Sequence, residues 1–216
     1  MMRFHLITLF PEACEAYLSA SILGRARKNK KISVSYQTPR DYVDNKWGKV
    51  DERPYGGGPG MVMTALPVVK AVKKSLGRKK GKAVFVWFSP GAPAFTNKEA
   101  DKLLAFDDVV LVCGRYEGID ERAAKMLKTM GTLKRYSVGE ATYTGAEVPA
   151  LAIVDAVTRR IPGVLGKDES VEERRVASGE VYTRPDTVVF GGKKYAVPKV
   201  LKTGDHAKID SWREKK

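Results

Sequence analysis

Short apolar runs alternate with amphipathic segments along this chain, and the alternation predicts its class of fold. Residues 83–88 and 109–113 are continuous apolar runs rich in β-branched and aromatic side chains, a pattern typical of strands buried on both faces. Residues 3–9 form a further strand-like run, and residues 32–36 alternate apolar with polar positions as a half-exposed strand does. These segments are predicted to be strands of one sheet.

Segments with helical periodicity lie between the strands. Residues 66–76 and 150–160 repeat apolar side chains at helical spacing, and Thr96 or Asn97 can cap a helix that Glu99 reinforces and that runs to Leu104. Strands that alternate with helices predict an α/β fold with an open, mostly parallel sheet. Further helices are expected over about residues 119–127 and from Pro11, with Ala13, Ala16, Tyr17, Ala20 and Leu23 at helical spacing.

Length and charge narrow the function. With 216 residues the chain fits one large domain, or one domain with a small appendage. The 39 Lys and Arg residues outnumber the 25 Asp and Glu residues, and the formal net charge of +14 favours a polyanion or an acidic surface as partner. No stretch approaches the roughly 18 apolar residues of a membrane span, and the first residues do not resemble a cleavable signal. We therefore expect a cytoplasmic protein with no membrane contact.

The cysteines and histidines predict neither a metal site nor a disulfide framework. Cys14 lies in a predicted helix and Cys113 in a predicted strand, which indicates small core residues. His5 and His206 have no metal-ligand spacing around them.

Three stretches rich in small residues interrupt the predicted elements. Residues 53–61 contain four glycines and two prolines, residues 114–118 follow a buried strand, and residues 136–149 form the third stretch. Open α/β sheets bind ligands beside the carboxyl ends of their strands, so these glycines predict loops whose backbone approaches a ligand. The alternatives are ordinary connectors and, after the strand at 109–113, a helix entry with acidic residues that favour the helix dipole.

Other charged segments are open to two interpretations. Two basic stretches are candidates for nucleic-acid contact or for solvated faces; they comprise residues 78–82 and Arg25, Arg27, Lys28, Lys30 and Lys31. Residues 167–179 are polar and charged and are expected to be mobile until a ligand binds. Residues 187–190 and 195–197 predict a hairpin.

Three longer motifs, two of which contain loops just described, point to a known family. The stretches Arg53-Pro-Tyr-Gly-Gly-Gly-Pro-Gly-Met61, Cys113-Gly-Arg-Tyr-Glu-Gly-Ile-Asp-Glu-Arg122 and Ile161-Pro-Gly-Val-Leu-Gly166 resemble those of the bacterial tRNA (guanine-N1)-methyltransferases. The resemblance extends to Leu9-Phe-Pro-Glu12 and Tyr182-Thr-Arg-Pro185, and so covers nearly the whole chain in family order.

The resemblance implies a SPOUT-class α/β domain with a deep trefoil knot, a rare exception to the rule against threaded loops. It further implies a homodimer, S-adenosyl-L-methionine as cofactor, and methylation of N1 of the guanosine 3′-adjacent to the tRNA anticodon. It also implies that Mg2+ is a possible requirement of the reaction. Residues 1–166 would be the knotted cofactor-binding domain, residues 167–180 a mobile active-site linker, and residues 181–216 a short remnant of the family's C-terminal tRNA-binding domain.

Matching this chain to the family assigns the site residues. The expected RNA contacts are Gly57, Gly58, Arg115 and Arg159. Glu140, Ala141 and Ala146 depart from the family pattern, and these departures bear on the size of the pocket. The expected cofactor-binding residues are Trp87, Phe88, Ser89, Pro90, Gly91, Gly114, Tyr116, Glu117, Gly118, Ser137, Val138, Gly139, Glu140, Ala141, Thr142, Tyr143 and Gly145.

The expected catalytic residues are Arg159 and Glu173. Methylation at N1 of guanine needs a base for the N1 proton and a cation for the charge that develops at O6. Arg159 matches the family arginine, but the family's aspartate base is missing, because ungapped counts from either side place Arg174 or Ser170 there. Glu173 is the preferred replacement. The alternatives are Glu172, Asp168, Glu169, Glu180, or a solvated charge run with no base in it.

Two other functions stay open at this point. One is a SPOUT methyltransferase that acts on ribosomal RNA or on another tRNA position. The other is a basic RNA-binding protein that has lost catalysis together with the aspartate. Cofactor binding would distinguish a methyltransferase from the non-catalytic RNA-binding protein. The position of the methylated nucleotide would distinguish the two methyltransferase activities from each other.

Overall fold

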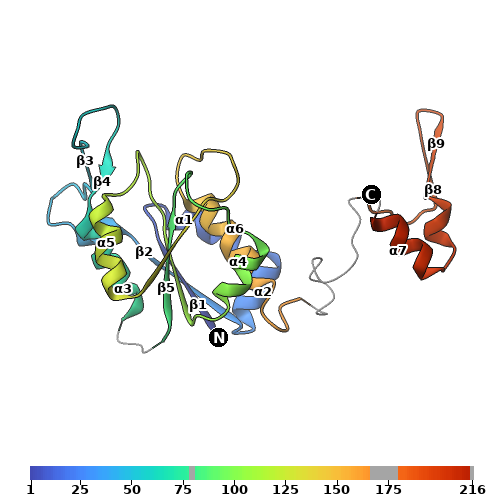
Figure 1. Ribbon diagram of the computed structural model, residues 1–216, viewed down its shortest axis with the longest axis horizontal. Coiled ribbons are helices and arrows are strands. Elements are labelled where there is room, and N and C mark those ends of the chain that lie inside the picture. The colour runs from blue at the N-terminus through green and yellow to red at the C-terminus, as the bar shows by residue number, and fades with distance from the viewer. Residues whose placement is uncertain (78–80, 166–179, 215–216) are drawn as a thin grey trace. The chain divides into compact units, whose positions relative to one another are not determined.

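A computed structural model gives the fold and describes residues 1–77, 81–165 and 180–214. The chain divides into two compact units, residues 1–165 and residues 166–216. Figure 1 traces the chain from the N-terminus through both units. No helix in the described part of the chain is long and apolar enough to span a bilayer.

The first unit is built on a five-stranded sheet in which every neighbouring pair is parallel. This confirms the α/β class and the parallel sheet that the alternation of apolar runs and amphipathic helices predicts. The strand order is β2-β1-β6-β5-β7. The bounds are β1 Met2–Ile7, β2 Ile32–Gln37, β5 Ala83–Phe88, β6 Asp108–Val112 and β7 Thr132–Tyr136.

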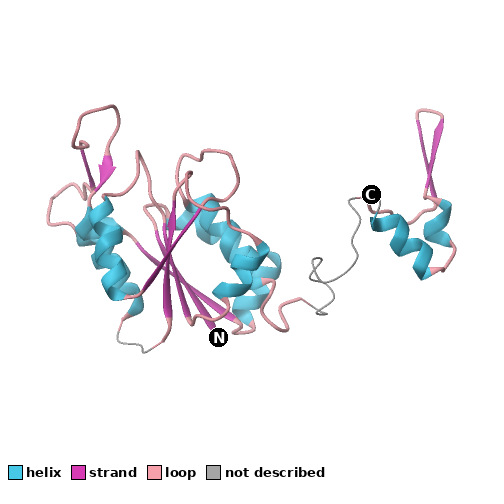
Figure 2. Ribbon diagram, in the orientation of Figure 1, coloured by secondary structure: helices cyan, strands magenta, loops and turns pink. Residues whose placement is uncertain are grey.

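Helices cover both faces of this sheet, as Figures 1 and 2 show. Because both faces are covered, the central strands carry continuous apolar runs instead of alternating ones. On one face lie α1 (Pro11–Leu18), α2 (Ser21–Lys28), α4 (Asn97–Leu103) and α6 (Glu147–Thr158). On the other lie α3 (Ala65–Leu76) and α5 (Glu121–Met130), with the 3-10 turn η1 (Pro39–Tyr42) beside α3.

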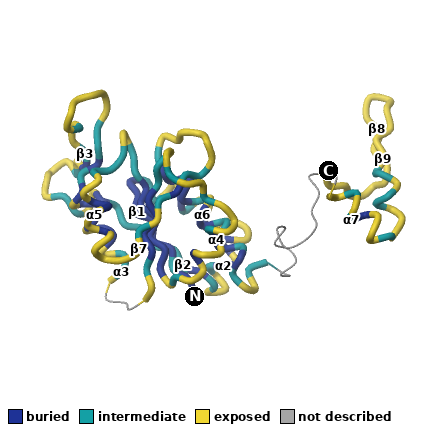
Figure 3. The backbone as a smooth tube through the Cα atoms, in the orientation of Figure 1, coloured by how far each residue is buried: buried dark blue, intermediate teal, exposed yellow. Residues whose placement is uncertain are grey.

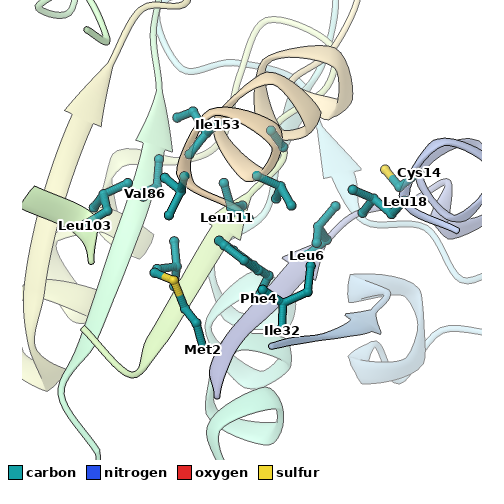
Figure 4. Packing of buried hydrophobic residues seen from close by; sticks show 14 of the residues in the cluster. Met2, Phe4, Leu6, Cys14, Leu18, Ile32, Val86, Leu103, Leu111 and Ile153 are labelled. Carbon is teal, nitrogen blue, oxygen red and sulfur yellow. The ribbon is translucent and has the colours of Figure 1, made fainter. Parts of the chain in front are cut away.

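The core consists of two layers, one on each face of the sheet. Phe4, Leu6 and Leu111 point to the α1 and α6 side, where Cys14 and Ile153 meet them (Figure 4). Figure 3 shows the strands as the most buried part of this unit. The opposite layer contains Ile7, Phe85, Val110 and Val112 together with buried residues of α3 and α5. Cys14 and Cys113 are both free and fully buried, which confirms them as core residues.

The N-terminal helical segment differs from the prediction. It is two helices, α1 and α2, and the break is so close-packed that a Cβ atom on Gly24 would lie 2.1 Å from the carbonyl oxygen of Ser19. Because the two short helices present different faces to the sheet, the residues buried in the core are Cys14, Leu18, Leu23 and Ala26. Of the residues noted for their helical spacing, Leu23 alone is buried, and Ala13, Ala16, Tyr17 and Ala20 are exposed.

Three short strands escaped sequence analysis. The edge strand β7 exposes Thr132 and Lys134, so it lacks the apolar run that identifies the central strands. β3 (Asp51–Glu52) and β4 (Val62–Met63) pair on either side of the glycine-rich residues 53–61. Two-residue strands carry too little periodicity for detection.

The second unit contains the predicted hairpin. β8 (Thr187–Phe190) pairs antiparallel with β9 (Lys193–Ala196) across Gly191 and Gly192, which both have the positive φ that glycine favours. The 3-10 turn η4 (Lys199–Lys202) and the helix α7 (His206–Glu214) follow. Within the unit, the rings of Tyr182 and Trp212 lie 6.2 Å apart, and Figure 3 shows the hairpin largely exposed.

Candidate active site

Two of the three predicted loops meet at one edge of the sheet through backbone hydrogen bonds. The amide of Glu117 donates to the carbonyl of Met61 (3.0 Å), and the amide of Met63 donates to the carbonyl of Gly118 (2.9 Å). Gly60 has φ +81°, and a Cβ atom there would lie 2.4 Å from Oε1 of Glu117. Residues 53–61 are therefore packed against residues 114–118, and a glycine at position 60 is what permits the approach.

The third loop closes on the same segment. The amide of Ala146 donates to the carbonyl of Gly114 (3.1 Å), and Arg115 forms an isolated antiparallel bridge with Gly145. At its other end, the amide of Ser137 donates to the carbonyl of Pro93 (2.9 Å). The loops after β5, β6 and β7 thus converge at the carboxyl ends of three parallel strands, where open α/β sheets bind ligands.

These loops enclose a cavity of about 280 Å³. Thirteen of the seventeen residues that the family resemblance assigns to the cofactor line it. Arg115, which was assigned to RNA, lines it as well, as do Tyr136, Thr144, Ala146 and Pro149. The thirteen are Phe88, Ser89, Pro90, Gly114, Tyr116, Glu117, Gly118, Ser137, Val138, Ala141, Thr142, Tyr143 and Gly145.

The other four assigned residues are not part of the lining: Trp87, Gly91, Gly139 and Glu140. Trp87 is 6% exposed and packs in the core layer formed with α3 and α5, because successive side chains of β5 point to opposite faces. Gly91, Gly139 and Glu140 are in the loops that border the cavity. Gly139 has φ +82°, which favours glycine for backbone reasons alone.

Arg115 is held on several sides at the cavity. Its Nε lies 3.0 Å from Oε2 of Glu147, and its guanidinium carbon lies 4.5 Å from the centre of the Phe10 ring. Nη1 donates to the carbonyl of Thr144 at 3.5 Å. Thr8 Oγ1 in turn donates to Oε1 of Glu147 at 2.7 Å. Glu147 is only 4% exposed, so the first unit places a buried carboxylate directly behind a cavity-lining arginine.

Sequence analysis missed the roles of Thr8 and Glu147. Glu147 is the first residue of α6, where a carboxylate is expected simply to favour the helix dipole, and Thr8 follows a strand without any motif. The signal that identifies them is burial of a charged group, which requires the tertiary structure.

The loop after β6 holds an unusual backbone conformation. Tyr116 has φ +59°, although it is not glycine, and its side chain is 51% exposed. Such conformations cost about 1–3 kcal/mol and cluster at functional sites. Gly118, two residues later, has φ +124°. The residues between Gly114 and Gly118 are thus held in a shape that an ordinary strand-to-helix turn does not need.

Two thiols and one phenol near the cavity are unsuited to covalent or acid–base chemistry at neutral pH. Burial raises the pKa of the Cys14 thiol to about 11, and it raises the pKa of the Cys113 thiol well above its usual value. Burial, together with its hydrogen bond to Glu99, also raises the pKa of Tyr136, which lines the cavity. Neither thiol is therefore a nucleophile, and the Tyr136 phenol keeps its proton.

Arg159 lies far from the cavity within one chain. Pro149, near the start of α6, lines the cavity, and Arg159 caps the other end of the helix, roughly 15 Å away at about 1.5 Å per residue. Ile161 and Pro162, just beyond Arg159, line a separate hollow with Met1 and Met2, where β1 begins. The structure thus separates Arg159 from the residues assigned to the cofactor.

The candidate bases are mostly outside the described residues. These are Asp168, Glu169, Glu172 and Glu173, and Ser170 and Arg174 also fall in this segment. Glu180 is described and exposed, and its Oε2 accepts a hydrogen bond from the Tyr182 hydroxyl at 3.0 Å.

A second hollow, of about 1,580 Å³, lies beside the first, and Glu117 lines both. Arg53, Tyr55, Met61 and Arg122 are among its lining residues. Gly57 and Gly58, assigned to RNA, are exposed on the loop between β3 and β4, and nothing lies within 4 Å of a Cβ atom built on either.

The basic residues at 25–31 are not equivalent. Arg25, Lys28 and Lys30 are exposed, whereas Arg27 is partly buried and its Nη1 donates to Oε1 of Glu15 at 2.8 Å. Among residues 78–82, the structure describes Gly81 and Lys82. Within the described residues, no group of three or more His, Cys, Asp or Glu side chains could hold a metal ion.

Comparison with known proteins identifies the family. The parallel sheet and the helices on both faces define the first unit as an open α/β domain, and its cavity lies at the carboxyl ends of the strands, where such domains bind ligands. The sequence model of the family described as tRNA (Guanine-1)-methyltransferase matches residues 2–216. This chain belongs to the tRNA (guanine-N1)-methyltransferase family.

Bacterial relatives agree with this assignment, and each of those compared bears the name tRNA (guanine-N(1)-)-methyltransferase. The relative from Pseudoalteromonas atlantica is 38% identical over 216 residues, which cover 98% of this chain and 78% of the relative. The Photobacterium profundum relative is 40% identical, covering 97% and 82%. The Lachnospira eligens relative is 40% identical, covering 100% and 89%.

Proposed function

We propose that this chain transfers a methyl group from S-adenosylmethionine to N1 of the guanosine 3′-adjacent to the tRNA anticodon. The observation that carries the proposal is the cavity made by the converging loops, in a chain of the tRNA (guanine-N1)-methyltransferase family. The net charge of +14 suits a folded RNA substrate.

The cavity fits a cofactor with separated charges. S-adenosylmethionine supplies a methyl group made electrophilic by its sulfonium, and the family implies this methyl donor. Gly114 and Gly145, which have no side chains, are part of the lining, and Val138 and Phe88 provide apolar surface. Arg115 and Glu117 are the charged lining residues among those described, one of each sign.

The proposed catalytic groups come from the other end of α6 and the segment after it. Arg159 would stabilise negative charge at O6 of guanine. Glu173 would accept the N1 proton as the methyl carbon bonds to N1 and its bond to the sulfonium sulfur breaks, with the electron pair of that bond staying on the sulfur of a neutral thioether product. Gly57, Gly58 and residues of the second hollow would contact RNA next to the cavity. The thiols and Tyr136 have no part in this scheme, because they stay protonated.

A homodimer would reconcile the position of Arg159 with this chemistry. Ala13, Ala16 and Tyr17 form an exposed face of α1, and Tyr17 donates to Asp155 of α6 (2.5 Å). Val148 and Ala152, at helical spacing with Asp155, expose further apolar surface on α6. An apolar surface over two adjacent helices is typical of a subunit interface. The proposal requires that a partner docked there brings its own Arg159 near the cavity.

The remaining expectations belong to the same proposal. They are the SPOUT-type knot, the division into residues 1–166, 167–180 and 181–216, a cytoplasmic location and a Mg2+ requirement. Omission of Mg2+ with a chelator present, in single-turnover methylation assays, tests the last of these.

Mapping the product decides among the open functions. Bulk tRNA and ribosomal RNA are incubated with the protein and isotopically labelled S-adenosylmethionine, digested, and examined by mass spectrometry. N1-methylguanosine next to the anticodon supports the proposal. Label at another tRNA position or in ribosomal RNA supports the second SPOUT activity. RNA binding without cofactor binding supports the non-catalytic alternative.

A further inference from the structure

The strongest unassigned feature of the first unit is the buried carboxylate of Glu147. It is 4% exposed, accepts a hydrogen bond from Thr8 and lies 3.0 Å from Nε of Arg115. Burial of an ionised group is costly unless it is paired, so Glu147 and Arg115 depend on each other.

Arg115 and Glu147 lie close together without forming a hydrogen bond. Nε of Arg115 and Oε2 of Glu147 are both buried, and neither has a hydrogen-bond partner among the described residues, although the two atoms are 3.0 Å apart. The N–H therefore does not point at the oxygen, and the attraction is that of an ion pair. Phe10 beneath the guanidinium and the Thr144 carbonyl beside it limit where the guanidinium can move.

Gly145 shows how closely this pair is packed. A Cβ atom on Gly145 would lie 2.4 Å from Nε of Arg115 and 2.6 Å from Oε2 of Glu147. Gly145 is not in a positive-φ conformation, so the close approach of the pair is what requires glycine here. The loop between β7 and α6 is thus shaped around the arginine.

We infer that Glu147 is a positioning residue that holds Arg115 in the cavity as the binding group for the carboxylate of the methyl donor. The inference rests on the proposed function. S-adenosylmethionine carries a carboxylate, and Arg115 is the one cationic side chain in the cavity lining among the described residues. A planar guanidinium restrained by Phe10 and Glu147 can bind a carboxylate with little loss of side-chain freedom. In this role Arg115 binds the cofactor, whereas the family resemblance implies that it contacts RNA.

The experiment compares S-adenosylmethionine with its decarboxylated analogue, which keeps the sulfonium and the amine. Calorimetric affinities are measured for the wild type, Arg115→Gln, Glu147→Gln and Arg135→Gln. Arg135 is a matched control, because it also pairs with a carboxylate, Glu121, and lies 5.7 Å from an aromatic ring, that of Trp87, but does not line the cavity. Thermal unfolding shows whether each variant is folded.

The wild type should prefer S-adenosylmethionine over the analogue by about ten- to a hundredfold, as a charge-assisted hydrogen bond allows. Arg115→Gln should bring the ratio close to one, Glu147→Gln should lower it partway, and Arg135→Gln should leave it unchanged. If Glu147→Gln does not fold, Arg115→Gln still decides the assignment of Arg115.

The inference is overturned if the wild type binds the cofactor but the ratio in Arg115→Gln equals that of the wild type. It is also overturned if Arg115→Gln raises KM for tRNA alone, which would assign the arginine to RNA. If Arg115→Gln lowers the affinity ratio but folded Glu147→Gln keeps the wild-type ratio, Arg115 binds the carboxylate and Glu147 has no positioning role. A wild-type protein that binds neither compound would defeat the proposed function itself, and is a distinct result.

Discussion

A Cβ atom at position 60 would lie 2.4 Å from Oε1 and 2.6 Å from Cγ of Glu117, so Gly60 and Glu117 occupy adjoining space between two hollows of the first unit. Glu117 lines both of them. A side chain at position 60 must therefore displace the whole of the Glu117 side chain, which links the loop between β3 and β4 to the proposed cofactor pocket.

Gly60→Ala should weaken binding of S-adenosylmethionine by about tenfold, because it combines a positive φ with a clash that moves Glu117. Isothermal titration calorimetry measures the affinity. Gly57→Ala is the matched control, since Gly57 has φ +79° but nothing within 4 Å of the added Cβ atom. Equal affinities for the two variants would show that the contact with Glu117 does not affect the pocket.

The buried cluster of Arg3, His5 and Asp108 predicts how stability responds to acid. Burial raises the pKa of Asp108, but hydrogen bonds from Arg3 and His5 outweigh it, and the net pKa is lowered below 3.8. A depressed folded-state pKa means that the carboxylate stabilises the fold above its unfolded pKa, and that this stability disappears as pH falls through the folded value. The loss should occur below about pH 4.

Asp108→Asn should reduce the free energy of unfolding at pH 7 by about 2–4 kcal/mol, near the lower part of the range for a broken buried pair because Arg3 keeps some access to water. Its further loss on acidification from pH 5 to pH 3 should be smaller than that of the wild type. Urea unfolding at several pH values measures both. Glu52→Gln, which removes the exposed pair with Lys49, should change little at pH 7.

The exposed basic residues Arg25, Lys28 and Lys30 should bind RNA phosphates. If they do, log affinity for tRNA falls linearly with log salt, and replacing all three by glutamine should make the slope shallower by about 0.7–0.9 per contact. Filter binding over a salt series measures this. Arg27→Gln should have a smaller effect, because Arg27 is already paired with Glu15. A slope that none of these changes alters would identify the segment as a solvated face.

Glu173→Gln should slow single-turnover methyl transfer at least about a hundredfold while leaving cofactor and tRNA affinity nearly unchanged, as loss of a general base does. Rapid-quench measurement with labelled cofactor gives the rate. Glu172→Gln is the neighbouring control and should have much less effect. A large loss from Glu172, Asp168 or Glu169 instead would move the base to that residue.

Subunit mixing tests the origin of Arg159. Gly145→Val should block the cavity, and Arg159→Ala should remove the cation, so each homodimer should be nearly inactive. If Arg159 acts in the cavity of the other subunit, exchange of subunits should restore about a quarter of wild-type activity through one intact site in each mixed dimer. Sedimentation equilibrium confirms the assembly. A monomer, or no recovery after demonstrated exchange, contradicts the dimeric site.

The sequence by itself determined most of the elements and the family. Continuous apolar runs identified β5 and β6 because a strand covered on both faces has no polar side to interrupt it, and the Thr96 cap and helical periodicity identified α4 and α3. Glycine and proline in residues 53–61, 114–118 and 136–149 marked the loops, because these residues exclude regular structure or permit close approach.

Only the tertiary structure decided what these loops form together. Strand β7 has no apolar run, since edge strands are half solvated. Its pairing with β5 nevertheless places residues 136–149, which follow it, at the cavity. Successive side chains of β5 point to opposite faces of the sheet, so Phe88 lines the cavity and Trp87 does not. An all-apolar run does not show which of two neighbouring side chains points to which face. Glu147 looks like a surface helix-start residue until packing buries it against Thr8 and Arg115, because pairing between residues 139 and 32 positions apart is set by the fold and by no local pattern.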